Sequence, residues 1–271
     1  MIKHATEAGW ISRSHRAISP FRLARPSSVQ QAVDLLNSED NPSIIAGGID
    51  LVRRMRGGDT WDTLIDISAI EELKTITKYG DYIRIGALVT HWDIETSALL
   101  GELLPDFRMA WTTIGNVRVR MAGTIGGNLM SGEAAYDGRV ILGVLGAELE
   151  FATESGKTRL LSSRSSHIFP AGALLMGVRI PIVSKRNMLF DRSLKPLVSV
   201  AVSIDGDCYS IGVGCAFDQP EFHSGTGSIQ AGSVSAVLPE PIDNPLGGSS
   251  YRRRMVGVLA ARAYRLLLGG G

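Results

Sequence analysis

Apolar residues recur at helical spacing along "PSSVQQAVDLLNSED", which begins at Pro26. Ser27 or Ser28 precedes them as an N-cap for the free amide groups, so the pattern predicts a helix. Its buried face is predicted to comprise Val29, Ala32, Val33 and Leu36. Three elements follow: a buried strand running into a turn at 43–48, a short helix at 49–58 ended by Gly57, and a strand at 61–68. Together these predict a βα unit of the α/β kind.

Strand and helix patterns alternate in the next stretch. Between 81 and 89, apolar and polar residues alternate, which predicts a half-exposed strand before a helix that begins near Thr90. Pro105 suits the first turn of a helix, which we expect to run on to residue 120. Its buried face would comprise Phe107, Ala110, Trp111 and Ile114. Further elements are a helix at 137–145 and strands at 147–153 and 174–183, the last closed by Pro181.

The pattern changes near residue 184. Two strands, 194–204 and 209–217, read as a hairpin with its turn at 205–207. Residues 218–248 are rich in Gly, Ser and Pro and show little periodicity outside 228–238. A closing helix is predicted at 249–268, with a shared face of Met255, Leu259, Arg262 and Leu266. We therefore expect a loose arm at 1–20, a first domain at 21–184 and a C-terminal domain at 185–271.

Composition narrows the class of protein. The chain has 271 residues, of which 44% are hydrophobic and 20% charged, as in ordinary globular proteins. Its formal net charge of +1 gives no reason to expect nucleic acid or an acidic membrane as the main partner. The first 21 residues resemble neither a signal peptide nor a membrane span. Only Cys208 and Cys215 are present, which excludes a disulfide framework and favours a cytoplasmic, reducing compartment.

A glycine pair, Gly47 and Gly48, stands between the strand at 43–48 and the helix that follows it. Consecutive backbone N–H groups in such a turn, with a helix N-terminus behind them, can hold an anion. An ordinary tight turn explains the same pair, because glycine serves turns generally. This turn therefore leaves both interpretations open.

A second glycine turn, "AGTIGGN", carries Gly123, Gly126 and Gly127 with the polar side chains of Thr124 and Asn128. Two such turns suit one diphosphate that links a nucleoside to a larger group. Neither matches the GxGxxG fingerprint or the GxxxxGK[ST] loop, which disfavours the nicotinamide dehydrogenase fold and the nucleotide triphosphatases. The residues thus predict a dinucleotide cofactor in an unfamiliar cradle.

Five segments resemble, in order, the FAD-binding medium subunits of molybdenum hydroxylases, the group of carbon monoxide and xanthine dehydrogenases. They are "IIAGGIDLVRRM", "LIDISAIEELKTI", "IRIGALVTHWDIE", "IGNVRVRMAGTIGGNLMSGEAAYD" and "YRRRMVGVLAARA". The resemblance runs from about Phe21 to Leu267. It implies an α+β fold: a two-subdomain FAD-binding domain of the PCMH type, followed by a small C-terminal domain of antiparallel strands and helices.

The resemblance also implies which residues bind FAD. The first turn would hold the pyrophosphate, and the second would cover the other side of the diphosphate and ribityl chain. Asp137 would touch the cofactor. The residues of the two turns are Ala46, Gly47, Gly48, Ile49, Asp50, Leu51, Gly123, Thr124, Ile125, Gly126, Gly127 and Asn128. The chain departs from the family's usual residues at Ser131, Glu133, Ala134 and Ala173, and the place of Arg192 or Lys195 relative to the flavin is open.

The function implied is that of an electron-transfer subunit of a heteromeric molybdopterin-dependent dehydrogenase or hydroxylase. A large subunit would carry the molybdopterin cofactor and a small one the 2Fe–2S clusters. FAD in this chain would pass electrons from those clusters to an external acceptor, and no catalytic residue is assigned. A free-standing flavoprotein reductase or oxidase and a flavin-less assembly subunit are the alternatives. Gly47→Val or Gly126→Val is expected to abolish FAD retention in a folded chain, because the new side chain would fill the phosphate space.

Other candidate residues have simpler interpretations. The five histidines, His4, His15, His91, His167 and His223, are dispersed, so we expect surface or capping roles and no metal site. Cys208 and Cys215 could face one another, although packing roles are favoured. Residues 252–254, three consecutive arginines, indicate a solvated helix face. Glu133 and Asp137 suggest either paired carboxylates or the acidic start of a helix, and we favour the helix start.

Overall fold

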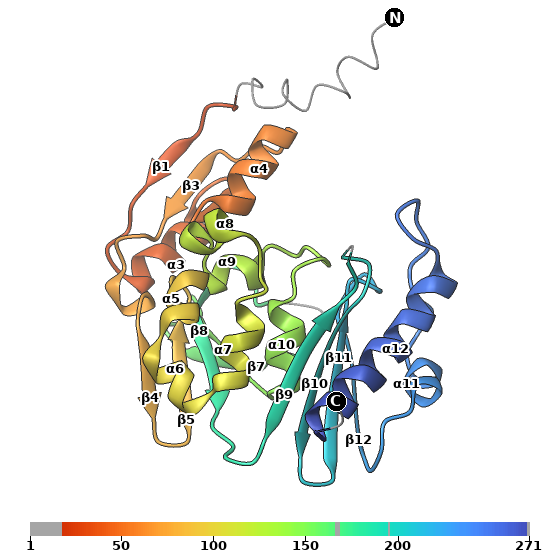
Figure 1. Ribbon diagram of the computed structural model, residues 1–271. Helices are drawn as coiled ribbons and strands as arrows, with labels where there is room; N and C mark the ends of the chain where they lie inside the picture. The colour runs from red at the N-terminus through yellow and green to blue at the C-terminus, as the bar shows by residue number, and fades with distance from the viewer. Residues whose placement is uncertain (1–17, 166–168, 195, 270–271) are drawn as a thin grey trace, which may run out of the picture.

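The computed structural model describes residues 18–165, 169–194 and 196–269. Figure 1 shows three sheets with helices packed around them, an α+β fold as expected. Residues 1–17 of the predicted arm lie outside the described part of the chain. None of the helices in the described ranges has the length and apolar character that crossing a bilayer requires.

A small parallel sheet, in the order β1–β3–β2, forms the N-terminal part. Its strands are β1 (Arg22–Ala24), β2 (Pro42–Ile45) and β3 (Thr63–Asp66), and its helices are α3 (Val29–Ser38) and α4 (Ile49–Gly57). Ser28 caps α3 by accepting a hydrogen bond from the Gln31 amide, as predicted. The predicted βα unit is therefore confirmed. Strand β2 is half-buried instead of fully buried, because it lies at the edge of its sheet.

A five-stranded antiparallel sheet, in the order β4–β5–β8–β6–β7, follows the parallel one. The strands are β4 (Ile76–Tyr79), β5 (Tyr82–Gly86), β6 (Glu148–Ala152), β7 (Thr158–Ser162) and β8 (Leu174–Pro181). The short 3-10 turn η1 (Glu71–Leu73) precedes them. The predicted strands at 81–89, 147–153 and 174–183 thus correspond to β5, β6 and β8, while the pattern missed β4 and β7.

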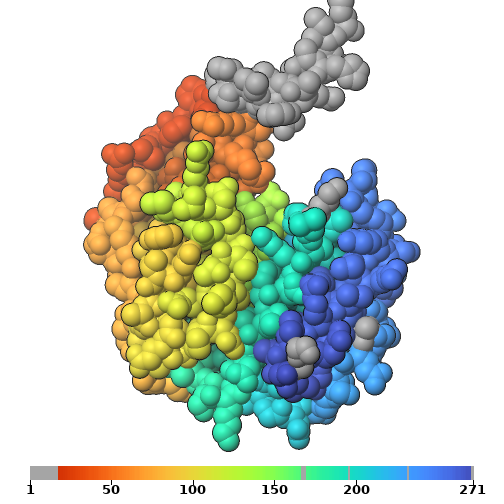
Figure 2. Space-filling model, in the orientation of Figure 1, coloured from red at the N-terminus to blue at the C-terminus, as the bar shows by residue number. Residues whose placement is uncertain are grey.

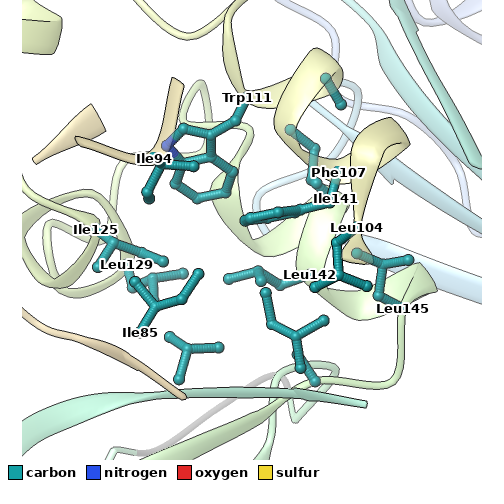
Figure 3. Close-up of a cluster of buried hydrophobic side chains, with 14 of the residues drawn as sticks. Ile85, Ile94, Leu104, Phe107, Trp111, Ile125, Leu129, Ile141, Leu142 and Leu145 are labelled. Carbon is teal, nitrogen blue, oxygen red and sulfur yellow. The ribbon is translucent and has the colours of Figure 1, made fainter. Parts of the chain in front are cut away.

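Six short helices lie along the chain between β5 and β6. They are α5 (His91–Thr96), α6 (Ala98–Leu103), α7 (Pro105–Trp111), α8 (Val117–Ala122), α9 (Ile125–Met130) and α10 (Gly138–Val144). Trp111 and Phe107 from α7 meet Ile141 from α10 in the core (Figure 3). Thr90 forms a full capping box with Asp93 at the start of α5, where a helix start was predicted. The core thus lies between α7, α10 and the sheet.

The C-terminal sheet has the order β12–β11–β10–β9 and is antiparallel throughout. Its strands are β9 (Asn187–Arg192), β10 (Ser199–Asp205), β11 (Cys208–Gly214) and β12 (Glu221–Thr226), and its helices are α11 (Ala231–Val237) and α12 (Ser249–Leu267). The predicted hairpin is confirmed: its turn places Gly206 at φ +58°. Strand β9 opens this sheet three residues after the expected domain boundary at 184/185, which stays a prediction.

The helix expected from Pro105 to residue 120 is broken. Helix α7 ends at Trp111, and α8 begins at Val117. Between them Gly115 takes φ +61°, and the Asn116 side chain caps α8 by accepting from the Val119 amide. Ile114 lies in the break and is not helical, but its side chain is buried. The apolar spacing of a helix therefore continues in the sequence across the break. The prediction of one continuous helix was therefore wrong.

The buried face of α12 also differs from the predicted one. Arg252, Val256, Gly257, Leu259, Ala260 and Ala263 are buried, whereas Leu266 is 49% exposed. Arg262 lies at the surface, where Nε donates to Asp191 at 2.7 Å. Arg252 is only 2% exposed, so the expectation that all three consecutive arginines face solvent was wrong. The structure instead turns the helix so that small residues pack on the C-terminal sheet.

Candidate functional site

A cavity of about 620 Å³ lies where the parallel sheet, the short helices and the start of the C-terminal sheet meet. Its lining includes all the residues that were predicted to bind the cofactor except Ile125. Ile125 is fully buried in the hydrophobic core instead. Figure 2 shows the molecule notched at the top, between the segments coloured orange to green and those coloured teal to blue. The volume is in the range typical of ligand pockets.

The first glycine turn presents an uncapped helix N-terminus to this cavity. Gly48 is the N-cap of α4 with φ +72°, a left-handed conformation that favours glycine. Among the described residues no side chain caps α4, so the amide groups of its first turn lack a side-chain acceptor there. The Asp50 carboxylate in the same turn accepts from Arg53 at 2.6 Å and from the Tyr136 hydroxyl at 3.2 Å. An anion at this turn would meet backbone donors and the positive end of the helix dipole.

The backbone amides of the second glycine turn already donate hydrogen bonds to other groups of the chain. Ile125 N donates to Val89 O at 2.9 Å, and Gly126 N donates to Ala87 O at 2.9 Å. Thr124 Oγ1 accepts from Gly127 N at 3.0 Å and thereby caps α9. The expectation that both turns point free amide groups at one diphosphate was therefore wrong for the second turn. What this turn offers the cavity is the Thr124 hydroxyl hydrogen and the Asn128 side chain.

Asn128 carries an unpaired polar atom at the cavity wall. Its Oδ1 is buried and has no hydrogen-bond partner among the described residues. The side chain packs so closely on Gly138 that a β-carbon there would lie 2.1 Å from Oδ1. Buried amide oxygens are nearly always hydrogen-bonded, so this oxygen, packed against Gly138, is an exception in the wall of the cavity that Asn128 lines.

Glycine in both turns is required by packing between parts of the chain. A β-carbon at Gly47 would lie 1.6 Å from Ala122 O, and one at Gly126 would lie 2.7 Å from Ala87 O. The expectation that Gly47→Val or Gly126→Val leaves a folded chain and fills only phosphate space was therefore wrong. Both substitutions would first displace the protein backbone.

Glu133 and Asp137 do not share a helix. Glu133 precedes α10 and accepts from Arg53 at 2.6 Å, which ties its loop to α4. Asp137 is the N-cap residue of α10 and makes no capping hydrogen bond. The loop 131–136, where the chain departs from the usual family residues, is thus held over the cavity by Arg53 and by Tyr136. Glu133 is therefore neither paired with the Asp137 carboxylate nor part of the first turn of a helix.

Asp137 is 6% exposed and borders the cavity. Burial raises the pKa of its carboxyl above the usual value, against the lowering effects of Ser199, Arg192 and Cys215. The nearest cation, Arg192 Nη1, lies 3.7 Å from Asp137 Oδ2 and also lines the cavity. The Cys215 thiol lies 3.9 Å from Asp137 Oδ1, and burial raises its pKa to about 11. Lys195, the other basic residue in question, lies outside the described residues.

The two cysteines do not face one another. Cys208 begins β11 and is exposed, whereas Cys215 follows the end of the same strand and is buried, so only Cys215 has the expected packing role. Cys215 takes φ +61°, which is unusual for a residue with a β-carbon. Arg252 holds this backbone: its Nη1 donates to Cys215 O and to Leu197 O, both at 2.7 Å.

His91 is a polar residue of the cavity that the sequence pattern missed. It was expected at the surface or in a cap, but it is 3% exposed and lines the cavity beside Gly123. Trp111 Nε1 donates to His91 Nδ1 at 3.0 Å. The sequence signal was its place directly after the Thr90 cap, but the packing against Trp111 depends on the tertiary fold. His223 is half-buried near Tyr209, and His4, His15 and His167 lie outside the described residues.

Comparisons with known proteins agree with this geometry. Residues 19–183 match the family described as the FAD binding domain in molybdopterin dehydrogenase. The nicotine 6-hydroxylase medium subunit of Paenarthrobacter nicotinovorans is 34% identical over 139 residues, 51% of this chain and 49% of that subunit. The carbon monoxide dehydrogenase medium chain of Afipia carboxidovorans is 28% identical over 274 residues, 90% of this chain and 95% of that one.

The fold also matches a solved structure. A chain of the copper- and molybdenum-containing carbon monoxide dehydrogenase superposes with a TM-score of 0.86 at 24% identity, covering 94% of this chain and 100% of that one. At this identity the likeness shows the fold alone, and it confirms the expected architecture of an FAD-binding domain followed by a smaller C-terminal part. The matched family covers more than half of the chain. The chain therefore belongs to the FAD-binding domain family of molybdopterin dehydrogenases and is an oxidoreductase subunit of the medium-subunit type.

Proposed function

We propose that this chain binds FAD in the 620 Å³ cavity and carries electrons from iron–sulfur clusters of a partner subunit to an external acceptor. The single observation that supports this most directly is the N-terminus of α4, which lines the cavity and has no side-chain cap among the described residues. FAD, when bound, would supply the redox chemistry, and the chain would bind, orient and shield it.

The residues present fit a dinucleotide. Its diphosphate is an anion, which suits the free amide groups at Gly48 and Ile49 and the dipole of α4. Its phosphate and hydroxyl oxygens can accept from the Thr124 hydroxyl and from the Asn128 side-chain amide, both of which belong to residues that line the cavity. The wall is otherwise mostly apolar, with Ile44, Leu174 and Leu175 among its residues, which suits a flat aromatic ring.

The individual roles follow from position. The proposed contacts at the first turn are Ala46, Gly47, Gly48, Ile49, Asp50 and Leu51, and those at the second turn are Gly123, Thr124, Gly126, Gly127 and Asn128. Ile125 was expected to join them, and we propose that it supports α9 from the core. Asp137, at the start of α10, and Arg192, at the end of β9, also line the cavity. They would face the flavin part of the FAD molecule.

We further propose that the native assembly is heteromeric. Matched relatives are named medium subunits or medium chains, which supports a large subunit with the molybdopterin cofactor and a small subunit with 2Fe–2S clusters. A cytoplasmic location and a domain boundary at 184/185 belong to the same proposal. Cys208 and Cys215, which are unpaired with one another, are compatible with a reducing compartment.

Two glycines at opposite ends of α4 test the cofactor site. Gly48 and Gly58 cap the helix with φ +72° and +114°, and an added β-carbon meets no backbone atom within 4 Å at either position. Gly48 lines the cavity and Gly58 does not. Both Gly48→Ala and Gly58→Ala should cost about 1–2 kcal/mol in backbone strain, but only Gly48→Ala should weaken FAD binding, by at least roughly tenfold.

The measurement is the flavin absorbance retained by purified chain after reconstitution with FAD and desalting. Stoichiometric flavin in the wild type and in Gly58→Ala supports the proposal. A wild-type chain that retains no flavin would instead support a flavin-less assembly subunit. Steady turnover of the isolated chain with NADH and a dye would support a free-standing reductase, and identifying the subunits that co-purify with the native complex would test the partners.

A further inference from the structure

His91 is held rigidly at the junction of the two glycine turns. Its backbone amide donates to Gly123 O at 3.0 Å. Its ring lies against Trp111, which is fully buried and packs on Phe107 with ring centroids 5.1 Å apart. The orientation of the imidazole is therefore set by the hydrophobic core and by the second turn together.

The hydrogen bond from Trp111 decides where the imidazole carries its proton. An indole N–H can only donate, so His91 Nδ1, 3.0 Å from Trp111 Nε1, must accept and carry no hydrogen. A neutral ring then has its hydrogen on Nε2. Burial, together with the nearby Arg120 guanidinium, lowers the pKa of His91 to about 4, so the ring is neutral near pH 7.

The remaining nitrogen, Nε2, lies beside Gly123 and the cavity. A β-carbon at Gly123 would lie 3.2 Å from it, and a β-carbon at Gly47 would lie 3.3 Å from Gly123 Cα. Nε2 has no hydrogen-bond acceptor among the described residues, although His91 is 3% exposed and lines the cavity. A donor that is oriented by the core and lacks an acceptor at a cavity wall is placed to meet an acceptor on the bound ligand.

We propose that His91 binds the cofactor by donating a hydrogen bond from Nε2 to an oxygen of the dinucleotide's diphosphate, an inference that rests on the proposed function. The diphosphate is favoured over the flavin ring because Nε2 lies near Gly123, which is a close neighbour of Gly47 in the first glycine turn, and all three residues line the same cavity. His91 thus supplies at the second turn a donor that the engaged amides of Ile125, Gly126 and Gly127 do not supply.

Two substitutions distinguish the effect of the hydrogen-bond donor at position 91 from the effect of the ring. Gln places its side-chain amide nitrogen near the position of Nε2, so His91→Gln keeps a donor, whereas His91→Phe keeps the ring shape and removes it. The dissociation constants of FAD and of riboflavin, which lacks phosphate, are measured by flavin fluorescence with the full-length chain. For FAD we expect an increase of roughly 10- to 100-fold in His91→Phe and at most about threefold in His91→Gln. The riboflavin constant should stay within about twofold of wild type in both variants.

The outcomes are distinct. The inference is overturned if His91→Phe binds FAD as tightly as wild type, or if His91→Gln is as weak as His91→Phe. A wild-type chain that binds no FAD would overturn the proposed function itself, whatever the variants do.

A measurement on the unaltered chain covers the case in which His91→Phe does not fold. Nitrogen-15 NMR of labelled histidine distinguishes the two neutral tautomers. We expect the Nε2–H form for His91 at pH 7, with a shift of this resonance on addition of FAD and no shift on addition of riboflavin. A hydrogen on Nδ1, or an Nε2–H resonance that FAD does not shift, would contradict the assignment.

Discussion

Gly47 packs against the carbonyl group of Ala122, so closely that a β-carbon at position 47 would lie 1.6 Å from the oxygen. The end of β2 and the end of α8 therefore touch through bare backbone. This contact joins the parallel sheet to the helical layer at one edge of the cavity. Glycine at this position thus has a structural role that is separate from any contact with a cofactor.

Gly47→Ala should destabilise the fold itself. A single methyl group cannot fit without moving the backbone of residues 122–123, so we expect a loss of about 2–4 kcal/mol in the free energy of unfolding. Gly57→Ala, at the end of the helix that follows Gly47, is the control, because a β-carbon there would meet nothing within 4 Å. Urea unfolding of the two FAD-free variants provides the measurement. Equal midpoints for Gly47→Ala and wild type would show that the two turns do not pack in this way.

Local signals allowed much of the fold to be predicted from the sequence. The capping residues Ser28 and Thr90 and the turn at Gly206 each act within a few residues, and the structure has them as expected. The glycine turns interrupt an otherwise apolar pattern, and the residues that the family resemblance implied at them line the cavity, apart from Ile125.

The remaining features depend on contacts between distant segments. Two amides of the second turn donate to the carbonyl oxygens of Ala87 and Val89, which lie after β5. Such contacts between distant segments leave no signal in the local sequence. Strand β12 lies in a Gly- and Ser-rich stretch and is specified by pairing with β11. The burial of Arg252 likewise depends on acceptors more than 30 residues away.

Arg252 should contribute strongly to stability. Its guanidinium donates to Leu197 O, Cys215 O, Gly247 O and Asn244 Oδ1. Arg252→Met keeps the apolar volume but removes the donor to the buried oxygens Leu197 O and Cys215 O, so we expect a loss of about 3 kcal/mol in the free energy of unfolding. Arg254→Met, at an exposed position of the same helix, should change it by less than about 0.5 kcal/mol. Chemical denaturation compares the two, and similar losses would contradict a buried role for Arg252.

Asp137→Asn should stabilise the FAD-free chain and weaken FAD retention. Because burial raises the pKa of Asp137, the folded state binds its proton more tightly than the unfolded state does. The stability that this proton provides is present at low pH and is lost as pH rises through the folded pKa. Asparagine removes the cost of burying the charge, so its urea midpoint should exceed the wild-type value most at pH 8 and least near pH 4. Asp81→Asn, at an exposed position outside the cavity, is the control. A lower midpoint for Asp137→Asn at pH 8 would contradict this prediction.

The pH dependence of stability should report the neutral state of His91. Its pKa is lowered from 6.5 to about 4 in the folded chain, so the unfolded chain binds the proton more readily between these values. Stability from this residue is therefore complete above pH 6.5 and falls as pH drops towards 4, with a total of up to about 3 kcal/mol. The ion pair of Arg120 with Glu95, at 2.7 Å, faces the same ring and keeps a cation beside it throughout this range. His91→Gln cannot titrate, so the difference in unfolding free energy between wild type and His91→Gln should shift with pH while the contributions of the carboxylates cancel. A difference that stays constant from pH 7.5 to pH 4.5 would mean that His91 is protonated equally in the folded and unfolded chains, and the hydrogen bond from Trp111 would then not fix its tautomer.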